Sequence, residues 1–129
     1  SQMIARKIKV SVGVIVVMVK LNDSSTAKAL WDSLPISGNA NIWGDEIYFS
    51  IPIYQEEEQD SQETVQIGDV AYWPPGRAMC LFWGQTPVSA PGEVRPASAV
   101  NVIGVIDGDP TVLNNVLDGS EITVERVIE

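Results

Sequence analysis

The sequence predicts a small, mainly β domain in which antiparallel strands are joined by turns and by two short helices. Several runs are dominated by valine and isoleucine, residues that suit a pleated, partly buried strand. Glycine, proline and aspartate separate these runs, as tight connections between strands require. The 129 residues are 45% hydrophobic, which is enough for one continuous core, so a single domain is expected over residues 1–129.

The first two strands are expected at residues 8–12 and 14–21. Valine and isoleucine dominate both, and Gly13 lies between them, where a turn or bulge forms most easily. Basic residues before this run and an A-x-A sequence at residues 27–29 are also features of a signal peptide. The apolar run is, however, rich in β-branched residues, interrupted by a serine and a glycine, and too short to span a bilayer. Strands are therefore expected here, and removal of a leader is not.

A short amphipathic helix is expected over residues 26–34. The preceding N-D-S-S sequence offers N-capping side chains, and Pro35 ends the helical pattern. Its apolar residues recur at spacings of three and four and are Ala27, Leu30, Trp31 and Leu34. We expect this stripe to cover one end of the sheet as part of the core rather than to contact a ligand.

The middle of the chain predicts one clear strand between two irregular segments. Residues 36–41 resemble a turn, whereas residues 43–53 alternate, with Ile47, Phe49 and Ile51 on the face expected to be buried. Residues 55–63, called the acidic loop below, are polar and lack a hydrophobic period. This loop is expected to be a solvated surface, because it lacks the alternating ligands and glycine of a calcium loop.

A hairpin is expected where residues 70–73 and 78–83 flank Pro74-Pro75-Gly76. Proline fixes φ and glycine accepts a positive φ, so Pro75 and Gly76 fit the centre of a type II turn. Residues 85–96 follow as a loop broken by prolines.

The C-terminal part predicts strand, helix and strand in turn. Residues 97–106 are expected to be a strand, and residues 107–110 a turn that starts a brief helix, with Pro110 near its first position. The helix is expected over residues 111–117 and the last strand over residues 122–127.

Composition excludes several classes of function. Eight basic and seventeen acidic residues give a net charge of −9, so nucleic acid and anionic membrane surfaces are not expected partners. The absence of histidine removes Ser-His and Cys-His nucleophile pairs and the commonest metal ligand. No metal or cofactor is expected. Cys80 is the single cysteine and lies in an apolar strand without a basic neighbour, so we expect an inert core thiol and a cytoplasmic protein.

Four segments, two of which overlap, carry a resemblance to a known family. Residues 102–116, V-I-G-V-I-D-G-D-P-T-V-L-N-N-V, resemble the V-F-G-x-V-x-x-G-x-x-V-x-x-x-I segment of cyclophilins. The sequences W-G-D-E-I-Y-F-S at 43–50, I-G-D-V-A-Y-W-P-P-G at 67–76 and P-A-S-A-V-N-V-I-G at 96–104 resemble the small prokaryotic cyclophilin-like proteins. The resemblance covers nearly the whole chain and implies a closed eight-stranded antiparallel barrel with a short helix at each end.

The resemblance does not carry an activity across directly. Cyclophilins isomerise X-Pro bonds with an arginine that contacts the prolyl amide, and the corresponding strand here, residues 47–53, contains no arginine. The position at which cyclophilins often carry a ligand-facing tryptophan falls on Arg95. The fold is therefore expected without its best-known catalytic group.

Candidate site residues gather at loops that join the expected strands. Glu46 and Tyr48 share one face of a strand and offer a carboxylate and a phenol to a ligand, the alternative being an outward polar pair. Trp73 with Phe82 or the adjacent tryptophan would form an aromatic wall, although core packing also explains at least two of them. The remaining candidates are Arg77 and Arg95 as cationic groups, for which ordinary ion pairing competes, and Thr86 and Ser98 as neutral donors.

These residues predict a binding module for a small molecule or short peptide in an outer cleft of the barrel. The alternative is a peptidyl-prolyl isomerase in which Arg77 or Arg95 replaces the missing arginine. A third hypothesis is a domain that acts only through protein contacts, with its acidic loop meeting a basic partner.

Overall fold

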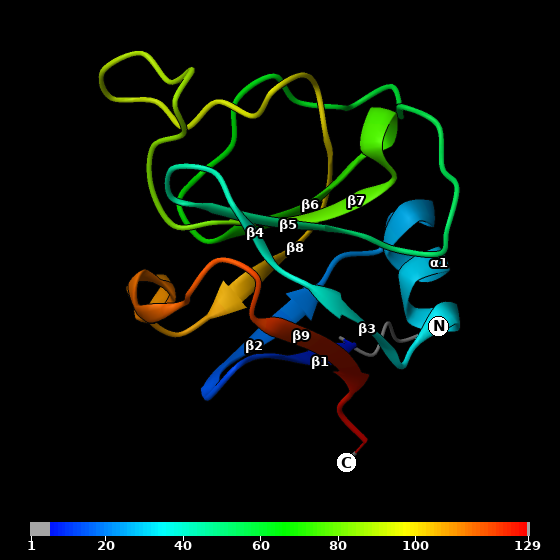
Figure 1. The fold of residues 1–129 in the computed structure, drawn as a ribbon. Coiled ribbons are helices and arrows are strands. Elements are labelled where there is room, and N and C mark those ends of the chain that lie inside the picture. Colours follow the sequence, from blue (N-terminus) through cyan, green and yellow to red (C-terminus); the bar gives the residue numbers. More distant parts are fainter. Residues whose placement is uncertain (1–5, 129) are drawn as a thin grey trace.

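Nine antiparallel strands form one sheet that curls into a nearly closed barrel in the computed structural model, which describes residues 6–128 (Figure 1). The strands are β1 (Lys7–Val12), β2 (Ile15–Leu21), β3 (Ile36–Asn39), β4 (Asn41–Ile42), β5 (Glu46–Ser50), β6 (Asp69–Trp73), β7 (Ala78–Phe82), β8 (Asn101–Asp107) and β9 (Glu121–Arg126). The helices are α1 (Ser25–Ser33) and the 3-10 helices η1 (Pro74–Gly76) and η2 (Pro110–Asn115). The mainly β fold and its antiparallel barrel are confirmed, with nine strands where eight were expected.

The ninth strand comes from the segment that closes the barrel. The strand order is β3-β9-β1-β2-β8-β6-β7-β5-β4, and only Ala40 separates β3 from β4 in the chain. One stretch of chain therefore pairs with β9 on one side and β5 on the other. The turn predicted for residues 36–41 is wrong. The alternation of apolar and polar residues that marks a strand is missing there because Gly38 occupies an inward position. It lies against the Phe49 ring, where a Cβ atom would come within 3.1 Å of Cδ2.

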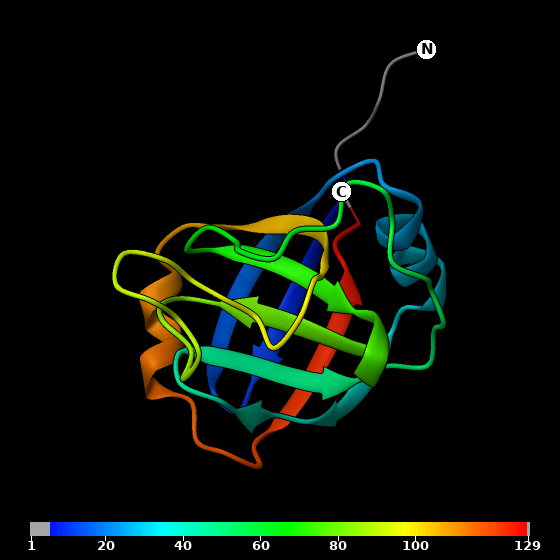
Figure 2. The same cartoon turned by 90° about the horizontal axis from the view of Figure 1, so that it is seen from above.

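Both ends of the barrel are covered by short helices, as expected (Figures 1 and 2). The Ser24 side chain caps α1 by accepting a hydrogen bond of 3.1 Å from the amide of Ala27, and Leu30 enters the core. At the other end, Asp109 caps η2 through the amide of Thr111, and Leu113 is fully buried. The second helix is a 3-10 helix and ends at Asn115, two residues before the expected end. Among the described residues, no helix is both long and apolar enough to cross a membrane.

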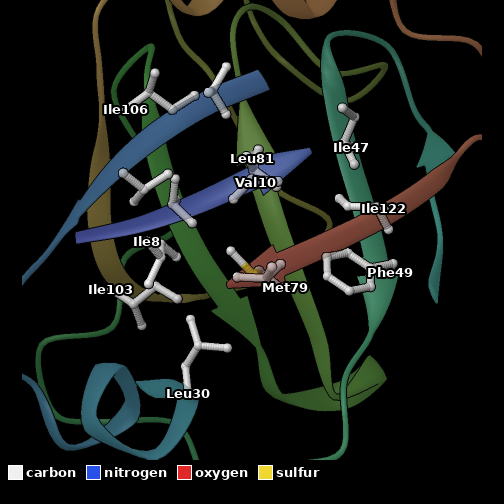
Figure 3. Packing of buried hydrophobic residues seen from close by; sticks show 14 of the residues in the cluster. Ile8, Val10, Leu30, Ile47, Phe49, Met79, Leu81, Ile103, Ile106 and Ile122 are labelled. Atoms are coloured by element: carbon white, nitrogen blue, oxygen red, sulfur yellow. The ribbon is translucent and has the colours of Figure 1, made fainter. Parts of the chain in front are cut away.

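The barrel interior is filled by alternate residues of the strands (Figure 3). Ile47, Phe49 and Ile51 are buried there, as their alternation predicted, and so are Met79 and Leu81 of β7.

A second apolar cluster lies on the outer face of β5, β6 and β7. Its buried members are Val65, Ala71, Ala78, Cys80, Phe82, Val94 and Val100. In Figure 2, the yellow segment that leads from β7 to β8 crosses over the green strands. Every residue of β7 is therefore buried, because this strand has the interior on one face and loops on the other.

Several boundaries differ from the expected ones. Strand β5 covers only Glu46–Ser50 of the expected 43–53, and β8 begins at Asn101 rather than at residue 97. The predicted type II turn is wrong, because residues 74–76 form η1 and the left-handed residue is Arg77, with φ 48°. Gly76 is needed for a steric reason, since a Cβ atom there would lie 2.5 Å from two carbons of the Trp73 ring.

The acidic loop is held to the barrel by several hydrogen bonds, including a backbone bridge between Gln62 and Val100. The Glu58 amide donates to Asn101 Oδ1 over 2.9 Å, and its carboxylate accepts hydrogen bonds from Ser25 Oγ and Thr26 Oγ1 at the start of α1. Asn101 Nδ2 donates to the Glu56 carbonyl over 2.9 Å. The loop was expected to be solvated throughout, but Glu58 is half-buried because its carboxylate binds the two hydroxyl groups at the start of α1 and its amide binds Asn101.

Candidate functional site

A small cavity of about 140 Å³ opens on the outer face of β5 and β7, and is called the outer cavity below. It is lined by Trp43, Glu46, Tyr48, Trp73, Cys80, Pro96, Ala97 and Val100. Strands supply its floor and the loop that precedes β8 supplies its roof.

Strand register positions the floor. Tyr48 is paired with Cys80 across β5 and β7, and Glu46 is paired with Phe82. Because side chains alternate along a strand, Glu46 and Tyr48 point to the outer face while Ile47 points into the barrel. The small Cys80 side chain forms part of the floor, whereas Phe82 is fully buried in the outer cluster.

The walls are fixed by hydrogen bonds outside the cavity. Trp73 Nε1 donates to Ser98 Oγ over 2.7 Å, which holds the indole against the loop that forms the roof. Trp43 lies between β4 and β5, where its amide donates to the Glu46 carbonyl over 2.9 Å. The roof loop is tied down by the backbone bridge between Val65 and Val94.

Glu46 is the unusual side chain of the cavity. The residue is 5% exposed, and its Oε1 atom has no hydrogen-bond partner among the described residues. Burial raises the pKa of Glu46 from 4.5 to about 7, and the neighbouring Cys80 thiol, a weak donor, offsets part of this rise. Burial and the nearby Glu46 in turn raise the pKa of Cys80 well above its ordinary value, so the thiol is neutral near pH 7.

This chemistry suits binding rather than nucleophilic catalysis. A buried carboxyl without a donor is costly unless a ligand supplies one, and a neutral, buried thiol is a poor nucleophile. Within residues 6–128, no three histidine, cysteine, aspartate or glutamate side chains come together in a way that could hold a metal ion.

The structure brings half of the sequence-predicted site residues together. Glu46, Tyr48 and Trp73 line the outer cavity, and Ser98 braces Trp73 from outside it. Phe82 lies beneath the surface, in the outer cluster.

The other three candidates lie elsewhere. Thr86 is buried in the roof loop and donates to the carbonyl of Arg95, while Arg95 pairs with Glu93 at 2.7 Å. Arg77 lies over the Tyr54 ring, 5.3 Å from its centroid. Neither arginine lines the outer cavity, so the structure gives no support to an arginine that replaces the cyclophilin one.

Sequence reasoning missed five lining residues: Trp43, Cys80, Pro96, Ala97 and Val100. Strand parity carried a signal for Cys80, since it lies two residues from Phe82 and shares its face. The three roof residues follow from the path of a long loop, which no local pattern indicates.

Comparison with known proteins agrees with this fold. The solution structure of the hypothetical protein AF2241 from Archaeoglobus fulgidus is similar, with a TM-score of 0.83 and 42% sequence identity over 98% of both chains. No curated protein matches the sequence significantly. The family model described as Cyclophilin-like matches residues 6–125. The chain therefore belongs to the cyclophilin-like family, as its barrel and its sequence both indicate.

Proposed function

We propose that the protein binds a small molecule, or one side chain of a short peptide, in the outer cavity. The observation that carries this proposal is a concave surface with three aromatic residues and a buried carboxyl group, one oxygen of which has no hydrogen-bond partner among the described residues. Apolar pockets with a few convergent polar groups and a perturbed pKa are typical of ligand sites.

The size of the outer cavity limits the group that enters it. An apolar cavity of about 150 Å³ holds a benzene molecule, and the outer cavity measures about 140 Å³. A group of about six non-hydrogen atoms therefore fits. A larger ligand would place only one such group inside and leave the rest on the surface.

A fragment screen by NMR tests the proposal. Small soluble fragments should shift the indole resonances of Trp43 and Trp73 and the amide of Tyr48. Ala97→Trp should abolish these shifts, because Ala97 is an exposed residue at the rim of the cavity, where a larger side chain blocks entry without disturbing the core.

Ala90→Trp is the matched control, since Ala90 is exposed on the same loop and does not line the cavity. It should bind fragments as the unmodified protein does. A screen in which no fragment perturbs the cavity residues, or in which Ala97→Trp binds as well as Ala90→Trp, would overturn the proposal.

A further inference from the structure

We infer that the group which enters the outer cavity is a small organic cation, an ammonium centre held between aromatic faces and the Glu46 carboxylate. The inference rests on the proposed ligand site and adds the chemical class of its ligand. Three features of the described residues support it: the buried carboxyl, the aromatic walls and the distribution of positive charge.

The carboxyl group lacks the partner that its burial demands. Glu46 is 5% exposed, and Oε1 accepts no hydrogen bond from the described residues. Buried carboxylates in proteins are paired with a cation or with several donors. Among the described residues, the polar side-chain groups that share the cavity with Glu46 are the indoles, the Tyr48 hydroxyl and the weakly donating Cys80 thiol. An ammonium group would supply the missing charge and, when it carries N–H groups, the missing donor.

The walls suit the same kind of group. Trp43, Tyr48 and Trp73 reach the cavity from the β4–β5 connection, from β5 and from the end of β6. The face of an aromatic ring is negative and attracts a cation within about 6 Å of its centre. Several rings around a carboxylate are typical of sites for methylated ammonium groups.

The protein's own cations lie outside the cavity. Within residues 6–128, no lysine or arginine lines it; Arg77 lies over Tyr54, and Arg95 pairs with Glu93. Beside the cavity, beyond the pair formed by Trp73 and Ser98, a groove is lined by acidic side chains, namely Glu56, Glu57 and Glu63. In a chain of net charge −9, this field attracts a cationic ligand and repels a carboxylate or phosphate.

Two probes of equal size, one charged and one neutral, separate the contribution of ligand charge to binding from that of ligand shape. Tetramethylammonium and tert-butanol each have about five non-hydrogen atoms, so both fit a cavity that holds a group of benzene size. In an NMR titration at pH 8, tetramethylammonium should bind about tenfold or more tightly than tert-butanol. Glu46→Gln should remove this preference, whereas Glu121→Gln, which loses the same charge at an exposed position on β9, should retain it.

The direction in which the affinity for tetramethylammonium changes with pH is an independent test of the inference. Tetramethylammonium does not titrate, whereas Glu46, with a pKa of about 7, is about one-tenth ionised at pH 6 and nine-tenths ionised at pH 8. The affinity of the cavity for tetramethylammonium should therefore rise about tenfold between pH 6 and pH 8. Tyr48 and Cys80 are the other titratable groups that line the cavity, and burial keeps the pKa of Cys80 above this range. A carbonyl ligand that accepts a hydrogen bond from the neutral Glu46 carboxyl group would show the opposite trend.

The outcomes distinguish the inference from the proposed function. The inference that the ligand is a cation is overturned if tert-butanol binds as tightly as tetramethylammonium, or if the affinity for tetramethylammonium falls as the pH rises. Either result leaves the proposed ligand site in place. If neither probe shifts the cavity resonances, the cation is overturned and the fragment screen alone decides whether the site exists. A trimethyllysine peptide that binds more tightly than tetramethylammonium would identify a side chain as the source, and equal affinity would identify a free small molecule; both support the inference.

Discussion

Changing Glu46 to glutamine should alter how the stability of the protein depends on pH. In the unfolded chain this carboxyl titrates near 4.5, whereas burial raises its pKa to about 7 in the folded protein. Between these values the folded state holds a proton that the unfolded state has released, so the free energy of unfolding falls as the pH rises. The difference between the two pKa values corresponds to a loss of about 3 kcal/mol, complete above pH 7.

Glutamine does not titrate, so the variant lacks this loss. We expect the stability of Glu46→Gln relative to the unmodified protein to increase by about 3 kcal/mol between pH 4.5 and pH 8. Groups that do not interact with Glu46 titrate equally in both proteins and cancel in the difference, including Asp69, whose pKa is raised by burial.

Urea unfolding followed by tryptophan fluorescence at pH 4.5, 6 and 8 measures this difference. Glu121→Gln is the control, because the side chain it replaces is exposed. Its stability relative to the unmodified protein should change little over the same range. A difference between Glu46→Gln and the unmodified protein that stays constant within about 0.5 kcal/mol would refute the electrostatic account of the cavity.

Three further changes test the packing around the site. Asn101→Leu should lower the free energy of unfolding by about 2 kcal/mol, because it leaves the Glu58 amide in the acidic loop without its acceptor; a urea titration that shows no loss would contradict this role. Gly104→Ala should cost about 1–3 kcal/mol, since a methyl group there overlaps the Lys20 carbonyl oxygen, and an unchanged melting temperature would disprove the close approach. The Cys80 thiol should resist a thiol reagent in the folded protein and react after urea is added, because burial raises its pKa; rapid reaction without urea would show that the outer cavity is more open than described.

Local patterns in the sequence predicted the elements whose structure depends on residues close together in the chain. The opening hairpin, the capped helix and the alternation of Ile47, Phe49 and Ile51 all follow short-range rules, and the structure contains each of them. Residues 36–41 broke the rule because Gly38 replaces an apolar side chain where the Phe49 ring fills the space. At this position a long-range contact, rather than a local period, decides the structure.

The same distinction between local and long-range causes applies to the candidate site. Glu46 and Tyr48 were placed on one face by strand parity, and the structure puts both in the cavity. The arginines were placed by loop sequence alone, and the loops are positioned by distant partners such as the bridge between Val65 and Val94. Arg77 therefore packs over Tyr54, and Arg95 pairs with Glu93, and no spacing in the sequence indicates these contacts.

Strand β7 belongs to two apolar clusters at once, because its residues alternate between the barrel interior and the outer face. Met79 and Leu81 fill the barrel, whereas Cys80 between them faces the outer cavity. A substitution at Met79 or Leu81 would therefore change the packing of the barrel interior, whereas a substitution at Cys80 would change the floor of the outer cavity. Effects on the barrel interior and on the outer cluster should therefore alternate along β7 with the two-residue period of a strand.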